Sequence, residues 1–274
     1  MADKPNQFEF FKMHGAGNDF ILVDDRNQTF PCSEKNRLLR IADRKRGIGS
    51  DGIILIQPSA QADFTMRFFN PDGGEAEMCG NGARCVARLA YDLNIAAEHM
   101  TFDTAAGKLR ADICGDNVRL YMTPPHGWRM NIDLDFDGRS ITCHQVNTGV
   151  PHAVIESDAI DAIDLPAIGA AIRYHETFAP AGTNVNFIQK TGDNTLRIRT
   201  YERGVEAETL ACGTGMVAAA LIAARLKTVA APVSLQTAGN DQLQVDFKMD
   251  ADDTATDVTL TGPAVHVFKG TLTV

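Results

Sequence analysis

Residues 209–226 read TLACGTGMVAAALIAARL, and residues 77–93 read EMCGNGARCVARLAYDL. In both stretches a cysteine is followed by Gly-x-Gly and then by a run rich in small apolar residues. Such a run favours a helix that begins just after the cysteine. The sequence therefore predicts two helices of one design, which start next to Cys79 and Cys212.

The repeat extends well beyond these two helices. Four landmarks recur in the same order, and the second copy of each lies 132 or 133 residues after the first. In a chain of 274 residues, an interval close to half the length indicates two copies of one domain. The four landmarks are Gly17 with Gly149, 49–51 with 182–184, Asn70 with Glu202, and Cys79 with Cys212.

The expected fold class is α+β, with two homologous, pseudo-symmetric domains. The helix after Cys212 is apolar on nearly every side until Arg225, so other structure must enclose it. Each domain is therefore expected to be a curved, mainly antiparallel sheet wrapped around a central helix, with the active site in the interdomain cleft. Residues 1–124 with 265–274 are expected to form the N-terminal half, and residues 125–264 the C-terminal half.

Local patterns predict the individual elements. Helices are expected at 33–46, with Ser33 as the cap, and at 165–174. Residues 124–127 (Pro-Pro-His-Gly) are interpreted as a linker, and a last strand at 265–268 is expected to cross back to the first domain. Branched and aromatic runs predict the other strands. These are expected at 8–12, 20–24, 53–56, 64–69, 100–104, 108–113, 118–122, 233–236, 243–247 and 258–260.

The composition is that of a globular protein, with 44% hydrophobic and 22% charged residues. A net charge of −9 argues against a nucleic-acid partner, because such partners need a basic face. No apolar stretch is long enough for a membrane span, and the N-terminus lacks the apolar core of a signal peptide. The six cysteines form no C-x-x-C pair, which suggests a reducing compartment. A cytoplasmic protein without a membrane partner is expected.

A cysteine at a helix N-terminus has chemistry of its own. It lies beside unpaired backbone amides at the positive end of the helix dipole, which stabilise a thiolate. Two such sites on either side of one carbon could remove a proton from one face and deliver a proton to the other, which inverts a stereocentre. The amides of Gly80, Asn81, Gly213 and Thr214 would stabilise the charge that develops.

This chemistry needs no cofactor, and the sequence carries no lysine and phosphate-cup pattern for pyridoxal phosphate. No metal site is expected, because no compact set of Cys and His ligands exists. The remaining cysteines have no matched partner in the other half, so they are expected to be buried small side chains. These are Cys32, Cys85, Cys114 and Cys143.

Over essentially its whole length, the chain resembles the diaminopimelate epimerase family. The resemblance implies a cofactor-independent isomerase that interconverts LL- and meso-2,6-diaminoheptanedioate, on the route to lysine and peptidoglycan. It also implies a homodimer with Phe268 at the interface. The stretches that carry it are MHGAGNDF (13–20), GIGSDG (47–52), FNPDGGEAEMCGNGARC (69–85), NTGVPHAV (147–154), GTNVNF (182–187) and YERGVEAETLACGTG (201–215).

The resemblance also implies a role for each site residue. Cys79 resembles the proton donor, and Cys212 the proton acceptor, for the LL substrate. His152 and Glu202 resemble residues that tune the two thiols. The implied substrate-binding residues are Asn18, Asn70, Gly80, Asn81, Asn184, Glu202, Arg203, Gly213 and Thr214.

This chain departs from the family pattern at Val150, where many members have Asn, and at Gly52, where many have Gln. It also has one extra residue before the second cysteine. These departures leave the thiol chemistry intact and concern recognition of the far end of the substrate. Val150 has no side-chain hydrogen-bonding group, and Asn147 could supply one in its place.

Other interpretations stay open. A related racemase or isomerase, such as a proline-racemase-like enzyme, could share the architecture. In a different class, Cys79 and Cys212 would cycle between dithiol and disulfide in a redox protein. Without the resemblance, the asparagines could serve turns, His152 could be structural, and Glu202 with Arg203 could be a solvated pair.

Overall fold

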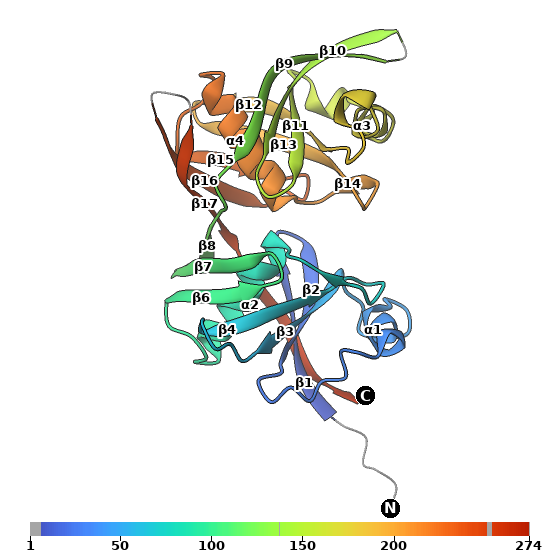
Figure 1. The fold of residues 1–274 in the computed structure, drawn as a ribbon, viewed down its shortest axis with the longest axis vertical. Coiled ribbons are helices and arrows are strands. Elements are labelled where there is room, and N and C mark those ends of the chain that lie inside the picture. The colour runs from blue at the N-terminus through green and yellow to red at the C-terminus, as the bar shows by residue number, and fades with distance from the viewer. Residues whose placement is uncertain (1–6, 137, 251–253, 274) are drawn as a thin grey trace, which may run out of the picture. The chain divides into compact units, whose positions relative to one another are not determined.

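The computed structural model describes residues 7–136, 138–250 and 254–273. They divide into two compact units, shown as a ribbon in Figure 1. One unit runs to Leu120 and includes the segment from Gly262 to the C-terminus, and the other is Tyr121–Thr261.

The first unit is a sheet of mostly antiparallel strands. β1 pairs antiparallel with β18 and with β2, and β7 pairs antiparallel with β6 and β8. β4 is antiparallel to β3 and β5, whereas β2–β3 and β4–β6 are parallel. The strands are β1 (Gln7–Gly15), β2 (Asn18–Asp24), β3 (Gly52–Gln57), β4 (Phe64–Phe69), β5 (Glu75–Ala76), β6 (His99–Thr104), β7 (Gly107–Cys114), β8 (Asn117–Tyr121) and β18 (Val265–Thr273).

The second unit repeats this pairing strand for strand. β10 pairs antiparallel with β9 and with β11. Two pairs are parallel, β11–β12 and β13–β15. The remaining pairs are antiparallel: β12–β13, β13–β14, β15–β16 and β16–β17. The expectation of two homologous sheets is therefore confirmed. The strands are β9 (His126–Phe136), β10 (Arg139–Asn147), β11 (Pro151–Glu156), β12 (Asn184–Gly192), β13 (Thr195–Glu202), β14 (Ala207–Thr209), β15 (Val233–Gln236), β16 (Gln242–Met249) and β17 (Ala255–Pro263).

The last strand of each copy belongs to the sheet of the other copy. β9 follows β8 along the chain but pairs with β10 in the second unit. β18 follows β17 but pairs with β1 in the first unit. Each sheet is therefore completed by a strand that follows the other copy in the sequence.

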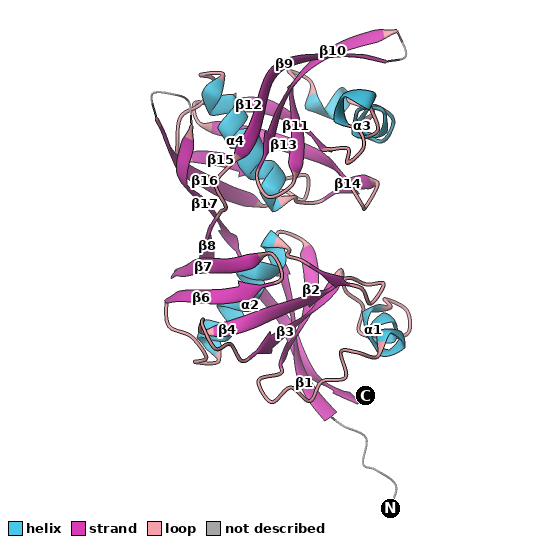
Figure 2. Cartoon of the chain, in the orientation of Figure 1, coloured by secondary structure: helices cyan, strands magenta, loops and turns pink. Residues whose placement is uncertain are grey.

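One helix lies at the centre of each sheet. α2 (Gly80–Asp92) contacts β1, β2, β3, β4 and β7, and α4 (Gly213–Arg225) contacts β10–β13, β15 and β16. Figure 2 shows both helices enclosed by strands of their own unit. Ten of the 13 residues of α4 are buried, which accounts for its nearly uniform apolar sequence. The two predicted central helices are confirmed.

A second helix covers the outer face of each sheet. In the first unit, Leu38 and Ile41 of α1 (Lys35–Ala42) pack against Ile21 and Ile53. In the second unit, Leu165 and Ile172 of α3 (Leu165–Arg173) pack with Ala153 and Val185 in the equivalent way, and two short 3-10 turns flank α3 at Ile160–Ala162 and Glu176–Phe178. Because side chains alternate along a strand, the residues between these positions face the central helices.

Two local predictions were wrong in their bounds. The helix expected at 33–46 is only Lys35–Ala42, and Ser33 does not cap it, because Glu34 holds the N-cap position. The helix ends early since the Asp43 carboxylate accepts hydrogen bonds from the next amides, those of Lys45 and Arg46, and turns the chain. The predicted linker is wrong in its second half, where His126 already begins β9.

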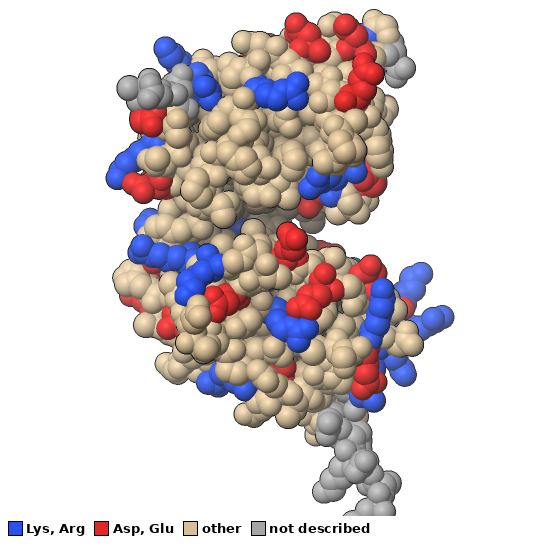
Figure 3. Space-filling view, in the orientation of Figure 1, with Lys and Arg blue, Asp and Glu red and all other residues tan. Residues whose placement is uncertain are grey.

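Within the described residues, none of the helices combines the length and the apolar character that a membrane crossing requires. On the face drawn in Figure 3, the described acidic and basic side chains are interspersed rather than gathered into areas of one sign.

Candidate active site

Both predicted cysteines lie where a central helix begins. Cys79 is the N-cap residue of α2 and Cys212 that of α4, and both have extended backbone (φ −137°, ψ 120° and φ −118°, ψ 108°). Their carbonyl oxygens accept the first helical hydrogen bonds, from Ala83 (2.8 Å) and Met216 (2.9 Å). Neither thiol caps its helix. Each cysteine is therefore the residue from which its central helix starts.

In the first unit, Cys79 lies against an asparagine pair. Its Sγ is 3.6 Å from Oδ1 of Asn18, and Nδ2 of Asn81 donates to the same oxygen at 3.2 Å. An amide oxygen can only accept, so the hydrogen bond from Cys79 requires a protonated thiol.

Two charged residues determine which way these amides point. The Asp51 carboxylate accepts from Nδ2 of Asn18 at 2.7 Å, and the Arg84 guanidinium donates to Oδ1 of Asn81 at 2.9 Å. Arg84 is fully buried in the core of the unit. Since a carboxylate only accepts and a guanidinium only donates, Asn18 must present its oxygen to Cys79. We call this set of residues the Cys79 group: Asn18, Asp51, Cys79, Asn81 and Arg84.

An ion cluster supports the Cys79 group from outside. Arg44 binds Asp51 at 2.6 Å and Asp19 at 2.5 Å, and Lys12 also pairs with Asp19. Burial alone would raise the pKa of the Asp19 carboxyl, but hydrogen bonds and charge from Arg44 and Lys12 lower it to about 2. This carboxylate therefore stays ionised at physiological pH.

In the second unit, Cys212 lies against a hydroxyl rather than an amide. Cys212 is only 8% exposed, and its Sγ is 3.7 Å from Oγ1 of Thr214. That oxygen is 2.9 Å from Nε2 of His152, whose side chain is fully buried. Burial, with a smaller contribution from the charge of Arg203, lowers the pKa of His152 to about 3, so its imidazole is neutral at pH 7.

The other ring nitrogen of His152 contacts a buried asparagine. Nδ2 of Asn186 lies 3.1 Å from Nδ1 of His152 and 3.1 Å from the carbonyl oxygen of Ala153. Oδ1 of Asn186 accepts from the hydroxyl of Thr200 at 3.0 Å. We call this second set the Cys212 group: Cys212, Thr214, His152, Asn186 and Thr200.

Three predicted substrate residues gather at the adjoining ends of β12 and β13. Oδ1 of Asn184 accepts from the amide of Arg203 at 2.8 Å, and Nδ2 donates to the carbonyl of Pro151 at 3.2 Å. The guanidinium of Arg203 donates to the carbonyl of Ala181 at 3.2 Å. Burial raises the pKa of the Glu202 carboxyl. Asn184 thus joins three backbone segments, a role that the sequence analysis did not predict.

Asn70 lies on an exposed turn after β4. Its amide donates to the carbonyl of Gly74 at 2.8 Å, and its carbonyl accepts from Gly73 at 2.9 Å. Among the hydrogen bonds of the described residues, its side chain has none that joins it to the Cys79 group. Gly80 and Gly213 are the first residues of α2 and α4.

The two departures from the family pattern have different surroundings. A Cβ at Gly52 would lie 2.4 Å from the ring of Phe68 and 2.9 Å from the carbonyl of Phe69, so this chain has no room for a side chain there. Val150 is half-buried in the turn between β10 and β11. Asn147, considered as its substitute, uses Oδ1 to accept from the amide of Gly149 at 3.0 Å.

The other cysteines are only partly as expected. Cys85 and Cys143 are buried, and burial raises the pKa of each thiol to about 12. Cys32 and Cys114 are half-buried, which corrects the expectation that all four are buried. Cys32 accepts from the guanidinium of Arg67 at 3.2 Å. Within the described ranges, no group of three His, Cys, Asp or Glu side chains is placed to hold a metal ion.

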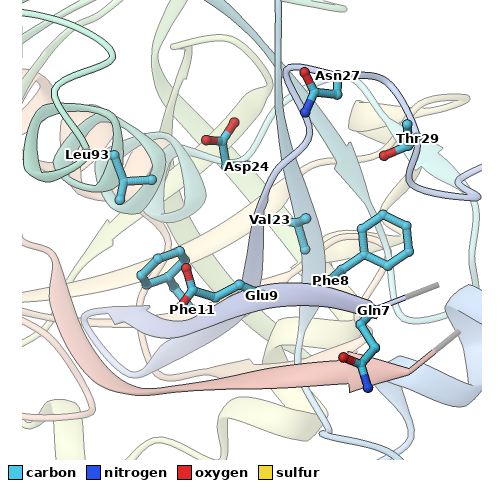
Figure 4. A pocket seen from close by; sticks show the side chains of 9 residues that line it. All are labelled: Gln7, Phe8, Glu9, Phe11, Val23, Asp24, Asn27, Thr29 and Leu93. Atoms are coloured by element: carbon cyan, nitrogen blue, oxygen red, sulfur yellow. The ribbon is translucent and has the colours of Figure 1, made fainter. Parts of the chain in front are cut away.

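A hollow of about 330 Å³ lies on the first unit, and Figure 4 shows the side chains that line it. Its lining includes Phe8, Glu9, Asp24 and Leu93, and it contains no residue of the Cys79 group. It is therefore separate from the candidate site.

The fold is shared with solved structures of several kinds of protein. A PhzF-family phenazine biosynthesis protein from Bacillus anthracis superposes with a TM-score of 0.76 at 16% identity, covering 98% of this chain and 100% of that one. A hydroxyproline epimerase from Agrobacterium vitis gives 0.73 at 17% identity, covering 100% and 94%. At these identities the likeness defines the fold class, the two-domain architecture of the PhzF and proline-racemase type.

Sequence relatives define the family within that class. The diaminopimelate epimerase family model matches residues 10–128 and 144–267. Diaminopimelate epimerases from Aquifex aeolicus and Methanothrix thermoacetophila are 41% and 44% identical, covering 96% and 97% of this chain and 97% and 96% of their own. The chain belongs to the diaminopimelate epimerase family, whose members are amino-acid epimerases.

Proposed function

We propose that the protein converts LL-2,6-diaminoheptanedioate to the meso form by a cofactor-independent reaction with two thiols, one from each unit. The Cys212 thiolate takes the α-proton from one face of the carbon, and the Cys79 thiol gives its proton to the opposite face. Cys212 ends as a thiol and Cys79 as a thiolate, so the proton count of the enzyme is unchanged. The reverse reaction restores the starting state.

The observation that carries this proposal is the pair of matched helix starts. Each cysteine has extended backbone, precedes glycine, and lies beside first-turn amides that have no partner within the helix. Such amides bind a carboxylate and stabilise the charge that builds on it as the α-proton leaves. One donor of this kind is typically worth about 2.7–4 kcal/mol of activation free energy.

The distal end of the substrate carries an ammonium and a second carboxylate. The arginine at the end of β13 is suited to the carboxylate and the neighbouring glutamate to the ammonium, because their charges are complementary. These residues are Arg203 and Glu202. Asn18, Asn70 and Asn184 supply amides that can bind either group.

Isotope exchange tests the reaction directly. LL-Diaminopimelate incubated with the enzyme in D₂O, without added cofactor, should yield meso product with deuterium at the inverted carbon. Cys79→Ala and Cys212→Ala should each reduce epimerisation by at least about 10²-fold, the lower bound for a positioned acid or base. Cys114→Ala, a half-buried thiol on β7, is the matched control and should leave the rate unchanged.

The same assay separates the alternative functions. A proline-racemase-like enzyme would exchange the α-proton of proline or hydroxyproline faster than that of diaminopimelate. A dithiol redox protein would reduce disulfide substrates and leave the α-carbon untouched. Either result would replace the proposed function.

We also place the protein in the cytoplasm, in the pathway to lysine and peptidoglycan, as a homodimer. The dimer is supported by β18, where Val265, Val267 and Phe268 are 41%, 56% and 50% exposed. An apolar row of this kind on an outer strand is suited to a partner surface. Phe268→Asp should convert the dimer to a monomer in sedimentation, whereas a wild-type monomer would contradict the assignment.

A further inference from the structure

The Cys212 group replaces an apolar part of the first unit. In the parallel pair β2–β3, Phe20 lies opposite Gly52, and in the equivalent pair β11–β12, His152 lies opposite Asn184. Two positions further along β3 and β12, the same register places Ile54 in the first unit and Asn186 in the second.

The central helices confirm this equivalence. A Cβ at Gly82 of α2 would meet Ile54 at 2.8 Å and Phe20 at 3.5 Å. A Cβ at Gly215 of α4 would meet Oδ1 of Asn186 at 2.4 Å. The third residue of each helix is therefore a glycine against which the same strand position packs.

The side chains at these strand positions are all completely buried, namely Phe20, Ile54, His152 and Asn186. Phe20 and Ile54 show that this position is well filled by apolar groups. A buried polar pair is costly unless every hydrogen bond is made, and it gains little over an apolar pair of similar volume. The His152–Asn186 pair therefore has a use other than packing.

The contacts determine which ring nitrogen of His152 carries the proton. A backbone carbonyl only accepts, so the side of Asn186 that faces the carbonyl of Ala153 is its NH₂ group. That NH₂ donates to Nδ1 of His152, which must then be unprotonated. The imidazole is neutral, so its proton is on Nε2, and Nε2 donates to Oγ1 of Thr214.

The hydroxyl of Thr214 thus accepts a hydrogen bond from Nε2 of His152 and keeps its own proton to donate. Its Oγ1 also lies within hydrogen-bonding distance of Sγ of Cys212. A thiolate can only accept, so with Cys212 ionised the series runs from Asn186 through His152 and Thr214 as successive donors and ends at sulfur. A hydrogen bond donated to sulfur favours the thiolate.

In the Cys79 group the hydrogen bond at sulfur runs the other way, because there the cysteine is the donor. There the chain of contacts ends in an amide oxygen, Oδ1 of Asn18, which accepts from the Cys79 thiol and favours its protonated form. We propose that Asn186 is a positioning residue that fixes the His152 tautomer and so makes Cys212 the proton acceptor of the resting enzyme, ready for the LL substrate. This inference rests on the proposed function for its meaning, and its test does not use the substrate.

Other groups near His152 remain constant in the test. The charge of Arg203 acts on His152, and Glu202 precedes it at the end of β13. Neither is altered in the variants below. Their effect on the titration of Cys212 is therefore the same in the wild type and in each variant.

The first experiment reads the tautomer in the wild-type protein. With ¹⁵N-labelled histidine, the side-chain shifts of His152 at pH 7 should show a protonated Nε2 and an unprotonated Nδ1. Assignment would use the spectrum of a His152→Phe variant. A protonated Nδ1, or a charged ring, would overturn the proposal.

The second experiment measures the pH midpoint of iodoacetamide alkylation at each cysteine by peptide mass spectrometry. The midpoint, unlike the rate, does not depend on how accessible the sulfur is. In the wild type, Cys212 should titrate about one pH unit or more below Cys79, the roughly tenfold effect of one hydrogen bond to a charged group. Asn186→Leu should raise the Cys212 midpoint by a similar amount and leave that of Cys79 unchanged.

Thr200→Val is the matched control. It removes a buried hydrogen bond to Asn186 but leaves the contacts of Asn186 with Ala153 and His152, so the Cys212 midpoint should stay in place. An equal shift in this control, or no shift in a folded Asn186→Leu protein, would overturn the inference. Deuterium exchange in the wild type tests the proposed function independently, so the two can fail separately.

Discussion

Phe20 and His152 occupy equivalent positions in the two units, each facing the central helix of its own unit. Phe20 is part of an apolar core, and His152 belongs to a series of hydrogen bonds that reaches a cysteine sulfur. The two units of this chain share one strand pairing, whereas the proposed inversion needs an acid on one side of the carbon and a base on the other. The difference between these two residues is one place where the symmetric fold becomes chemically asymmetric.

Replacing His152 with phenylalanine makes the second unit resemble the first. We expect a folded protein with a kcat reduced by about 10²–10⁴-fold, since the thiol loses its support as a base. The N–H of Asn186 that faced the ring loses its partner, which should cost about 1–3 kcal/mol of unfolding free energy. Steady-state kinetics and urea unfolding measure both effects.

His144→Phe is the matched control for that variant. His144 is also buried, and its Nδ1 accepts from the amide of Asn131 at 3.1 Å, but it lies outside the Cys212 group. It should lose stability and keep its kcat. Equal losses of kcat in the two variants would refute a specific role for His152.

Stability should fall in mild acid because of His152. Its folded pKa of about 3 is below the ordinary value of 6.5, so between these limits the unfolded chain binds more protons than the native one. The contribution is complete above about pH 6.5 and is lost as the pH falls toward 3, at up to about 1.4 kcal/mol per pH unit. Urea unfolding of the wild type and His152→Phe between pH 5 and 7 should show a steeper loss in the wild type.

Glu202 has the opposite effect on the pH dependence of stability over part of the range between pH 3 and 6.5. Burial raises its pKa, so the native state binds more protons above pH 4.5 and loses stability as the pH rises through the folded pKa. Both proteins carry Glu202, and the difference between them therefore isolates His152. Parallel curves for the two proteins would contradict the prediction.

Gly215→Ala should disturb the Cys212 group. The new methyl group would lie 2.4 Å from Oδ1 of Asn186 and 3.3 Å from Sγ of Cys212, so both must move. We expect a loss of about 1–3 kcal/mol in stability, typical of overpacking, together with a large loss of activity. Gly80→Ala has nothing within 4 Å of its Cβ and should keep its Tm within about 2 °C. Equal Tm losses would show that helix-start glycines matter for another reason.

Gly52→Ala tests whether Phe68 accounts for the glycine in β3. The added Cβ meets the ring at 2.4 Å, and we expect a stability loss of about 1–3 kcal/mol by thermal unfolding. Phe68→Leu in the same chain removes the nearest ring atoms and should recover part of that loss. A double variant less stable than the sum of the single changes would argue against this contact.

Much of the architecture could be predicted from the sequence, because the sequence itself contains the repeat. The repeated Cys-Gly-x-Gly segments and the uniformly apolar stretch up to Arg225 predict two enclosed helices, and α2 and α4 fit them. Strand partners are less accessible, since a run of branched residues predicts a strand but not its neighbour. The end of α1 depended on one side chain, that of Asp43, which receives two backbone amides.

The supporting residues of the site could not be predicted in the same way. Asp51 and Arg84 act through contacts with residues distant in sequence or on the buried side of a helix. Asn186 did leave a signal: it is a polar residue between Val185 and Phe187, in the buried first half of β12. Aligning the two halves residue by residue would have set it against Ile54 and raised the question of its purpose.

The exchanged strands β9 and β18 have a consequence for how the chain can be divided. Two pieces cut between β9 and β10 would each end in a strand that pairs in the other unit, so each would lack the strand beside its own first strand. Such pieces should fold well only when both are made together and can trade their tails. A piece cut at the unit boundary, Tyr121–Thr261, carries β9 to β17 and should fold without the other.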